Sequence, residues 1–142
     1  MAKTLKVFDP WSQETYQCWI SVGTYHYGGT PALSLWSENG PYSNITTNLV
    51  GYECAEGCVL LDTNNMPEIC GLLYSNGLAV ETGRVAYSGW CAYPEFMLNW
   101  PAIAEYTDDD VSGYVAMFNA KKCKELEFEC EVYDPEEEEG EA

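Results

Sequence analysis

The sequence predicts an α+β fold: an antiparallel sheet, built as a meander, with one or two helices packed on it and an acidic disordered C-terminal tail. Three observations support this prediction. Short β-branched and aromatic runs separated by turn residues fill much of residues 1–100. Apolar residues recur at helical spacing within residues 66–75, and residues 134–142 are mostly acidic and cannot build a core. We therefore expect a single domain over residues 1–133 and a tail over residues 134–142.

The meander is expected in the first half of the chain. Strand-like runs cover residues 5–8, 16–27, 31–37 and 42–50. Asn39-Gly40 lies between the last two runs, and an Asn-Gly pair in this setting is a strong hairpin signal. A short apolar run at residues 59–61 predicts a further, buried strand.

A helix is predicted over residues 66–75, packed across one face of the sheet. The Asp-Thr-Asn-Asn sequence at residues 62–65 offers side chains that cap a helix, and Pro67 suits a first turn. Asn76-Gly77 tolerates the left-handed conformation that ends a helix. Aromatic-rich strands should follow over residues 80–98, broken at Ser88-Gly89 and at Tyr93-Pro94.

Residues 108–120 allow two interpretations. Thr107 followed by three aspartates suits a helix start, and apolar residues follow at spacings of three and four. A hairpin strand over residues 114–118 is the alternative, because Gly113 and nearby aromatic residues favour it. The pattern leaves both possibilities open.

Residues 125–132 alternate strictly between acidic and apolar side chains. As a strand, this segment turns Glu125, Glu127, Glu129 and Glu131 to one face. Side chains two residues apart on a strand lie about 6.6 to 6.8 Å from one another. The predicted row of carboxylates thus resembles one line of nucleic-acid phosphates.

Several short segments carry a family resemblance. They are Asp-Thr-Asn-Asn at 62–65 with Pro67-Glu68, Asn-Gly-Leu-Ala at 76–79, Thr82-Gly83, Ser88-Gly89, Tyr93-Pro94 and, upstream, Thr-Thr-Asn-Leu at 46–49. Together they resemble the uncharacterised bacterial family called domain of unknown function 4313, over residues 5–100. The resemblance carries no activity. It implies cargo of plasmids, conjugative elements and phages, where small anti-defence proteins also travel. The acidic extension after Glu105 goes beyond the family pattern and is where we expect this member's own function.

The net charge of -17 restricts the possible partners. It repels nucleic acid and anionic membranes, so a basic protein surface is the natural counterpart. The acidity is concentrated late in the chain, with 14 of the 23 acidic residues after residue 100. No apolar run approaches the roughly 20 residues of a membrane span, and the first residues lack a signal sequence, so we expect a cytoplasmic protein of a bacterial host cell.

The seven cysteines and the single histidine bear on metal binding and catalysis. An odd number of scattered cysteines favours free thiols. Cys54, Cys58, Cys70 and Cys91 could bind zinc, but their spacing lacks the paired pattern of strong zinc motifs. No nucleophile or phosphate-binding motif is present, and Asp62, the best candidate acid, is explained equally well by capping. We expect no enzyme, metal or cofactor.

The functional hypothesis places recognition on the acidic residues. We expect Asp108, Asp109, Asp110, Glu125, Glu127, Glu129 and Glu131 to bind a basic nucleic-acid-binding protein, such as a CRISPR effector or a restriction nuclease, as a DNA mimic. Two alternatives stay open. The acids could only protect a sheet edge and aid solubility, or a small protein- or ligand-binding module could use an aromatic face formed by Trp90, Tyr93, Phe96 and Trp100.

Overall fold

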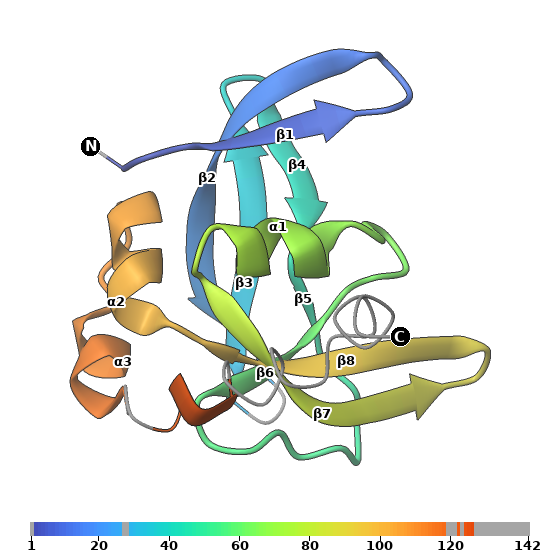
Figure 1. Ribbon diagram of the computed structural model, residues 1–142, viewed down its shortest axis with the longest axis vertical. Helices are drawn as coiled ribbons and strands as arrows, with labels where there is room; N and C mark the ends of the chain where they lie inside the picture. The colour runs from blue at the N-terminus through green and yellow to red at the C-terminus, as the bar shows by residue number, and fades with distance from the viewer. Residues whose placement is uncertain (1, 27–28, 119–121, 123, 127–142) are drawn as a thin grey trace, which may run out of the picture.

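Two antiparallel four-stranded sheets form the framework of the chain (Figure 1). The computed structural model describes residues 2–26, 29–118, 122 and 124–126. The strand orders are β1-β2-β3-β4 and β5-β6-β8-β7. Antiparallel strands with a few short helices confirm the predicted fold class, but the strands divide between two sheets where one was expected. The predicted tail, residues 134–142, and the boundary at residue 133 lie outside the described residues.

The first sheet is the predicted meander. Its strands are β1 (Leu5–Asp9), β2 (Glu14–Thr24), β3 (Pro31–Ser37) and β4 (Gly40–Asn44). The hairpin prediction is confirmed: Ser37 pairs with Gly40, whose φ of 114° is one that glycine adopts readily. The predicted strand over residues 31–37 matches β3, whereas β2 begins earlier and ends earlier than the predicted 16–27.

The predicted strand over residues 42–50 is wrong in its extent. The chain leaves the first sheet after β4 and enters the second sheet as β5 (Thr46–Thr47). Ile45 between them is fully buried; its N–H donates to the carbonyl of Leu33 and its carbonyl accepts from the N–H of Asp62. Ile45 therefore joins the two sheets at a point where a single strand was expected.

The second sheet contains β5, β6 (Cys58–Leu61), β8 (Cys91–Leu98) and β7 (Ala79–Ser88). All four residues of β6 are buried, as the short apolar run at residues 59–61 predicts. The predicted break at Tyr93-Pro94 is wrong, because Pro94 lies inside β8. The last register pair between β6 and β8 is Leu60 with Glu95, so the missing N–H of Pro94 falls just past this ladder.

Helix α1 (Ile69–Ser75) starts later than the predicted residue 66 and has no side-chain cap. The carboxylate of Asp62 instead accepts hydrogen bonds from the backbone N–H and the side-chain Nδ2 of Asn65, so residues 62–65 form a local turn. The C-terminal end of α1 is as predicted. Gly77 has a φ of 72°, and the N–H groups of Gly77 and Leu78 donate to the carbonyls of Tyr74 and Leu73.

Three short helical elements follow β8: α2 (Trp100–Ile103), the 3-10 helix η1 (Ala104–Tyr106) and α3 (Ser112–Met117). The first two were not predicted, although Asn99 accepts a hydrogen bond from the N–H of Ala102 as an N-cap does. Helix α3 confirms the helical interpretation of residues 108–120 over the hairpin. It starts at Ser112 and lacks the predicted Thr107 cap.

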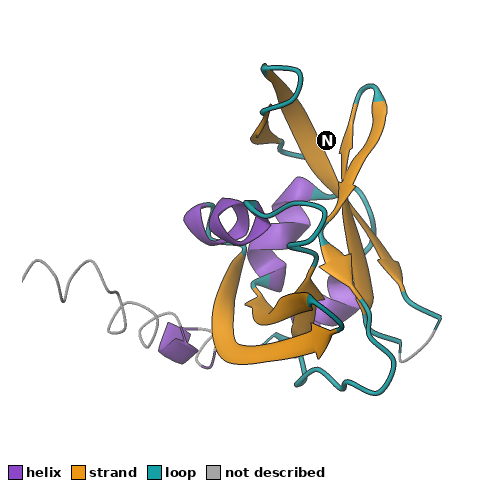
Figure 2. Ribbon diagram, turned by 90° about the vertical axis from the view of Figure 1, so that its right-hand side faces the viewer, coloured by secondary structure: helices purple, strands orange, loops and turns teal. Residues whose placement is uncertain are grey.

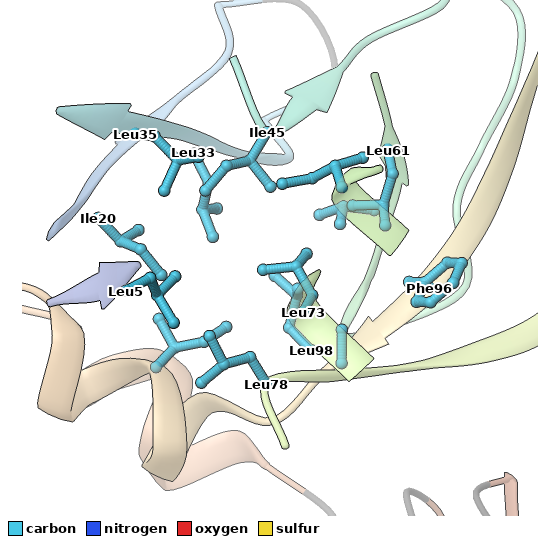
Figure 3. Packing of buried hydrophobic residues seen from close by; sticks show 14 of the residues in the cluster. Leu5, Ile20, Leu33, Leu35, Ile45, Leu61, Leu73, Leu78, Phe96 and Leu98 are labelled. Atoms are coloured by element: carbon cyan, nitrogen blue, oxygen red, sulfur yellow. The ribbon is translucent and has the colours of Figure 1, made fainter. Parts of the chain in front are cut away.

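The core lies between the inner face of the first sheet, the inner face of the second sheet and α1 (Figure 3). Figure 2 shows α1 and the first sheet in separate layers, with the helix seen nearly end-on. Cys58, Val80 and Met97 form a second, smaller cluster, against which Phe118 and Leu126 pack. No helix among the described residues is long and apolar enough to cross a membrane.

Candidate partner-binding surface

The predicted acidic loop lies between η1 and α3, and its three aspartates have different roles. All three are exposed. Asp109 Oδ2 accepts a hydrogen bond from the backbone N–H of Val22 in β2 at 2.8 Å, and the hydroxyl of Thr107 lies 3.4 Å away. The backbone N–H of Asp109 in turn donates to the hydroxyl of Thr107. Asp109 therefore anchors the loop to the first sheet and is only partly available to a partner.

Asp110 is held by the residue that starts α3. Its Oδ1 accepts from the backbone N–H of Ser112 at 3.0 Å and from the Ser112 hydroxyl at 2.7 Å. These hydrogen bonds, the side-chain one first, lower the pKa of Asp110 below its ordinary value. Asp110 is consequently ionised throughout the neutral range, and with Asp108 it presents negative charge at the N-terminal side of α3.

The predicted row of glutamates is wrong at its first residue. Residues 124–126 have helical conformation, so Glu125 does not begin a strand. Leu126 packs against the small cluster of Cys58, Val80 and Met97 while Glu125 is exposed. Lysine, glutamate and leucine all favour helices, which outweighs the two-residue alternation here. Glu127, Glu129 and Glu131 lie outside the described residues, so their common face stays a prediction.

Exposed carboxylates far outnumber exposed cations among the described residues. Exposed acids occur in strands, loops and helical segments along the chain. They are Glu14, Glu38, Glu53, Glu56, Glu68, Glu81, Glu105, Asp108, Asp109, Asp110 and Glu125. Two of the basic side chains form ion pairs, Lys3 with Glu105 at 3.1 Å and Arg84 with Glu95 at 3.7 Å. Much of the positive charge is thus already paired with carboxylates of the same chain.

Glu95, in the middle of β8, is fully buried, which no pattern in the sequence indicates. The Thr82 hydroxyl donates to its Oε1 at 2.8 Å, and the backbone N–H of Ala55 donates to its Oε2 at 3.1 Å. The Tyr52 hydroxyl lies 3.4 Å from the same Oε2. Each carboxylate oxygen therefore has a hydrogen-bond donor, and the group ties the loop before β6 to the β7–β8 hairpin.

Arg84 covers this buried carboxylate from the solvent side. Its guanidinium donates to the carbonyl of Glu53 at 3.2 Å and lies 5.4 Å from the ring centroid of Tyr52. Burial, followed by the negative charge of Glu95, raises the pKa of Cys58 to about 12 and that of Cys54 to about 11. Both sulfurs are therefore protonated thiols at neutral pH, so neither is an activated nucleophile.

The four cysteines considered for zinc do not assemble. Cys54 and Cys58 belong to the small cluster on the second sheet, Cys70 lies on α1 and Cys91 starts β8. Within the part of the chain that the structure describes, no group of three or more His, Cys, Asp or Glu side chains is arranged to hold a metal ion. The five described cysteines are free thiols.

The predicted aromatic face also separates into different environments. Phe96 and Trp100 are buried in the core, and Trp100 stacks on Tyr114 with ring centroids 4.3 Å apart. Trp90 is fully exposed at the tip of the β7–β8 hairpin, with Tyr87 nearby at 76 % exposure. These aromatic residues therefore form no common cradle.

The chain matches the model of a known protein family. A family model described as "Domain of unknown function (DUF4313)" matches residues 19–118. No curated protein and no solved structure matches the chain significantly. The matched region includes both sheets from the second half of β2 onwards and extends through the acidic loop and α3. The expectation that the chain goes beyond the family pattern after Glu105 is therefore wrong for Asp108, Asp109 and Asp110. It holds for Glu125, Glu127, Glu129 and Glu131, which lie beyond the match.

Proposed function

The chain belongs to the DUF4313 family, and from this premise we propose that it is a non-enzymatic acidic interaction protein of a mobile genetic element. In this proposal it is an anti-defence inhibitor, directed against a CRISPR effector or a restriction nuclease, that acts in the cytoplasm of the bacterial host. It occupies the basic nucleic-acid groove of that nuclease as a DNA mimic. The observation that carries the proposal is the net charge of -17 on a chain of 142 residues.

The physical argument is electrostatic. DNA that binds a basic nuclease groove releases the cations condensed along its phosphates. A protein bearing carboxylates in place of phosphates is attracted to the same basic groove, with a smaller release of ions because its charges are less dense. Long-range attraction between opposite net charges also speeds association. Both effects weaken as salt is added, because the Debye length falls from about 10 Å at 0.1 M to about 3 Å at 1 M.

The arrangement of the acidic loop supports the proposal. Because Asp109 anchors the loop to β2 and Asp110 is fixed by Ser112, the loop binds a partner with little further loss of conformational freedom. Leu126 packs against the small cluster of Cys58, Val80 and Met97, which holds this segment in place while Glu125 next to it stays exposed. In Figure 1 both segments occupy the lower left part of the molecule.

The test is inhibition of DNA cleavage by a purified partner nuclease, identified by affinity capture and salt-gradient elution. In the test variant, glutamine replaces Glu125, Glu127, Glu129 and Glu131, which removes four charges and keeps side-chain size. The control variant carries Glu14→Gln, Glu38→Gln, Glu53→Gln and Glu68→Gln, an equal change of charge at exposed positions elsewhere. We expect the test variant to lose inhibition and the control to keep it. Equal inhibition by both variants and the wild type would reject the acidic segment as the recognition surface.

A second candidate function is favoured by the exposure of Trp90. Tryptophan is usually well buried, whereas Trp90 is fully exposed at a hairpin tip. Tryptophan is also one of the residues that contribute most to the binding energy of protein interfaces. In this alternative, the chain is a small binding module that uses its exposed aromatic residues, and the acidity serves solubility. Trp90→Ala would then abolish partner binding, and the glutamine variant would bind like the wild type in the same capture experiment.

A further inference from the structure

A groove of about 500 Å³ lies along β3 and β4. It is lined by residues of β3 and β4 and by Asn65, which comes from the turn before α1. In Figure 1, β4 lies to the right of the centre, away from α3. Its volume falls in the range of about 300 to 1,000 Å³ that is typical of small-molecule sites.

The lining of the groove carries no charged side chain, although the chain holds 23 acidic residues. The carboxylate of Asp62, which accepts from Asn65 Nδ2, is buried. Hydroxyl and carboxamide groups of Ser34, Ser43, Asn44 and Asn65 line the groove beside two aromatic rings. Such a surface suits an uncharged ligand that both donates and accepts hydrogen bonds.

Trp36 provides a fixed aromatic surface in this groove. Its Nε1–H donates to the hydroxyl of Ser34 at 3.0 Å, two residues earlier on the same face of β3. Trp19 lies directly opposite Trp36 on β2, and Pro41 pairs with it on β4. The ring is only partly buried, so one apolar face is held in place and remains accessible to a ligand.

Hydrogen-bonding groups surround this ring. Asn44 is exposed, and its carboxamide supplies both donors and an acceptor. Asn65 donates from Nδ2 to Asp62, and its carboxamide also carries an acceptor, Oδ1. In the described chain β4 pairs only with β3, so its second edge has backbone N–H and C=O groups without a strand partner.

We propose that this groove binds a neutral saccharide, with an apolar sugar face on the Trp36 ring and sugar hydroxyls on Asn44 and Asn65. The net charge of -17 disfavours phosphorylated or acidic ligands at any point of the surface. The hydroxyl and amide lining disfavours a fully apolar ligand, because these groups would lose hydrogen bonds to water without replacement. A hydroxyl-rich uncharged ligand satisfies both restrictions.

Titration with cellobiose, maltose and N,N'-diacetylchitobiose, followed by ¹H–¹⁵N correlation spectra, tests the proposal. At least one disaccharide should shift the Trp36 indole signal and the backbone amides of β3 and β4. An acidic disaccharide from heparin and a short oligothymidylate should shift them less. The glutamine variant of the acidic segment should bind the sugar like the wild type, which separates this site from the proposed DNA mimicry.

Substitutions assign the binding to the groove. Trp36→Ala should weaken sugar binding at least tenfold, and Asn44→Ala several-fold, while Trp90→Ala should leave it unchanged. If Trp36→Ala does not fold, Asn44→Ala decides the question, because Asn44 is exposed and its side chain is not part of the core. The proposal is overturned if no disaccharide shifts the β3 and β4 amides, if Asn44→Ala binds as tightly as the wild type, or if oligothymidylate shifts these amides more than sugars do.

Discussion

Replacing Glu95 by glutamine tests whether the buried carboxylate holds the loop before β6 against the β7–β8 hairpin. Its two oxygens accept from the Thr82 hydroxyl at 2.8 Å and from the Ala55 N–H at 3.1 Å. Glutamine retains only one carbonyl oxygen. Its amide NH₂ faces either the N–H of Ala55, which then loses its acceptor, or the Thr82 hydroxyl, which must turn from donating to accepting.

The expected cost follows from these contacts. A hydrogen bond to a charged group contributes about 1.5 to 3 kcal/mol, and a buried donor left unpaired costs about 1 to 3 kcal/mol. Removing the charge also removes the desolvation penalty of a buried carboxylate, which offsets part of the loss. We expect Glu95→Gln to lower the free energy of unfolding by about 2 to 4 kcal/mol, consistent with the cost of breaking buried polar networks.

Urea unfolding followed by tryptophan fluorescence measures this difference, and the melting temperature should fall by about 5 to 15 °C. Arg84→Gln is the matched control, because Arg84 is about half exposed and its ion pair with Glu95 spans 3.7 Å. Its loss should cost no more than about 1 kcal/mol. A wild-type urea midpoint for Glu95→Gln, or an equal loss for both variants, would refute the structural role of the buried carboxylate.

Three further predictions concern stability, each measured by urea unfolding. Asp109→Ala should cost about 1 to 2 kcal/mol because the N–H of Val22 loses its acceptor, whereas Asp108→Ala should stay within about 0.5 kcal/mol of the wild type; equal costs would contradict the anchoring role. Gly77→Ala should cost about 1 to 2 kcal/mol, because φ is 72° at this position; an unchanged midpoint would argue against the left-handed helix end. The Cys58 thiol should leave stability unchanged below about pH 9 and reduce it as pH rises from there toward about 12, because the thiol ionises first in the unfolded chain; a Cys58→Val variant should show a weaker decline.

Elements with strong local signals could be predicted from the sequence. The β3–β4 hairpin was predictable from Asn39-Gly40, the end of α1 from Asn76-Gly77, and β6 from its apolar run, because in each case neighbouring residues alone determine the backbone. The helical state of α3 was one of two interpretations that the sequence allowed, and the apolar residues at spacings of three and four favoured it. Local chemistry and tertiary structure agree at these places.

The errors arise where tertiary contacts decide between local alternatives. Asp62 can cap a helix or close a turn, and its burial beside Ile45 selects the turn. Pro94 breaks a strand only where a partner strand needs its N–H. The β6–β8 pairing stops at Leu60 and Glu95, and Pro94 is tolerated in the pairing with Val85 of β7. The unpredicted α2 had a usable signal, an asparagine N-cap at Asn99 followed by Pro101.

The candidate sites were predictable to different degrees. The exposure of the aspartate loop followed from its charge, but the bond from Asp109 to the N–H of Val22, 87 residues away in sequence, had no local signature. The burial of Glu95 could not be predicted either, since an acidic residue in a strand normally indicates an exposed face. The alternation from Glu125 onward predicted a strand. Residues 124–126 are helical instead, and Leu126 packs against Cys58, Val80 and Met97 from this helical segment.

Competition with DNA tests the proposed mimicry most directly. The captured nuclease is titrated with the protein in the absence and presence of its duplex DNA substrate, at increasing salt concentration. DNA mimicry predicts that the two ligands exclude one another and that the logarithm of the binding constant falls linearly with the logarithm of the salt concentration. A stable ternary complex of nuclease, DNA and protein, with an affinity that does not change with salt, would contradict it.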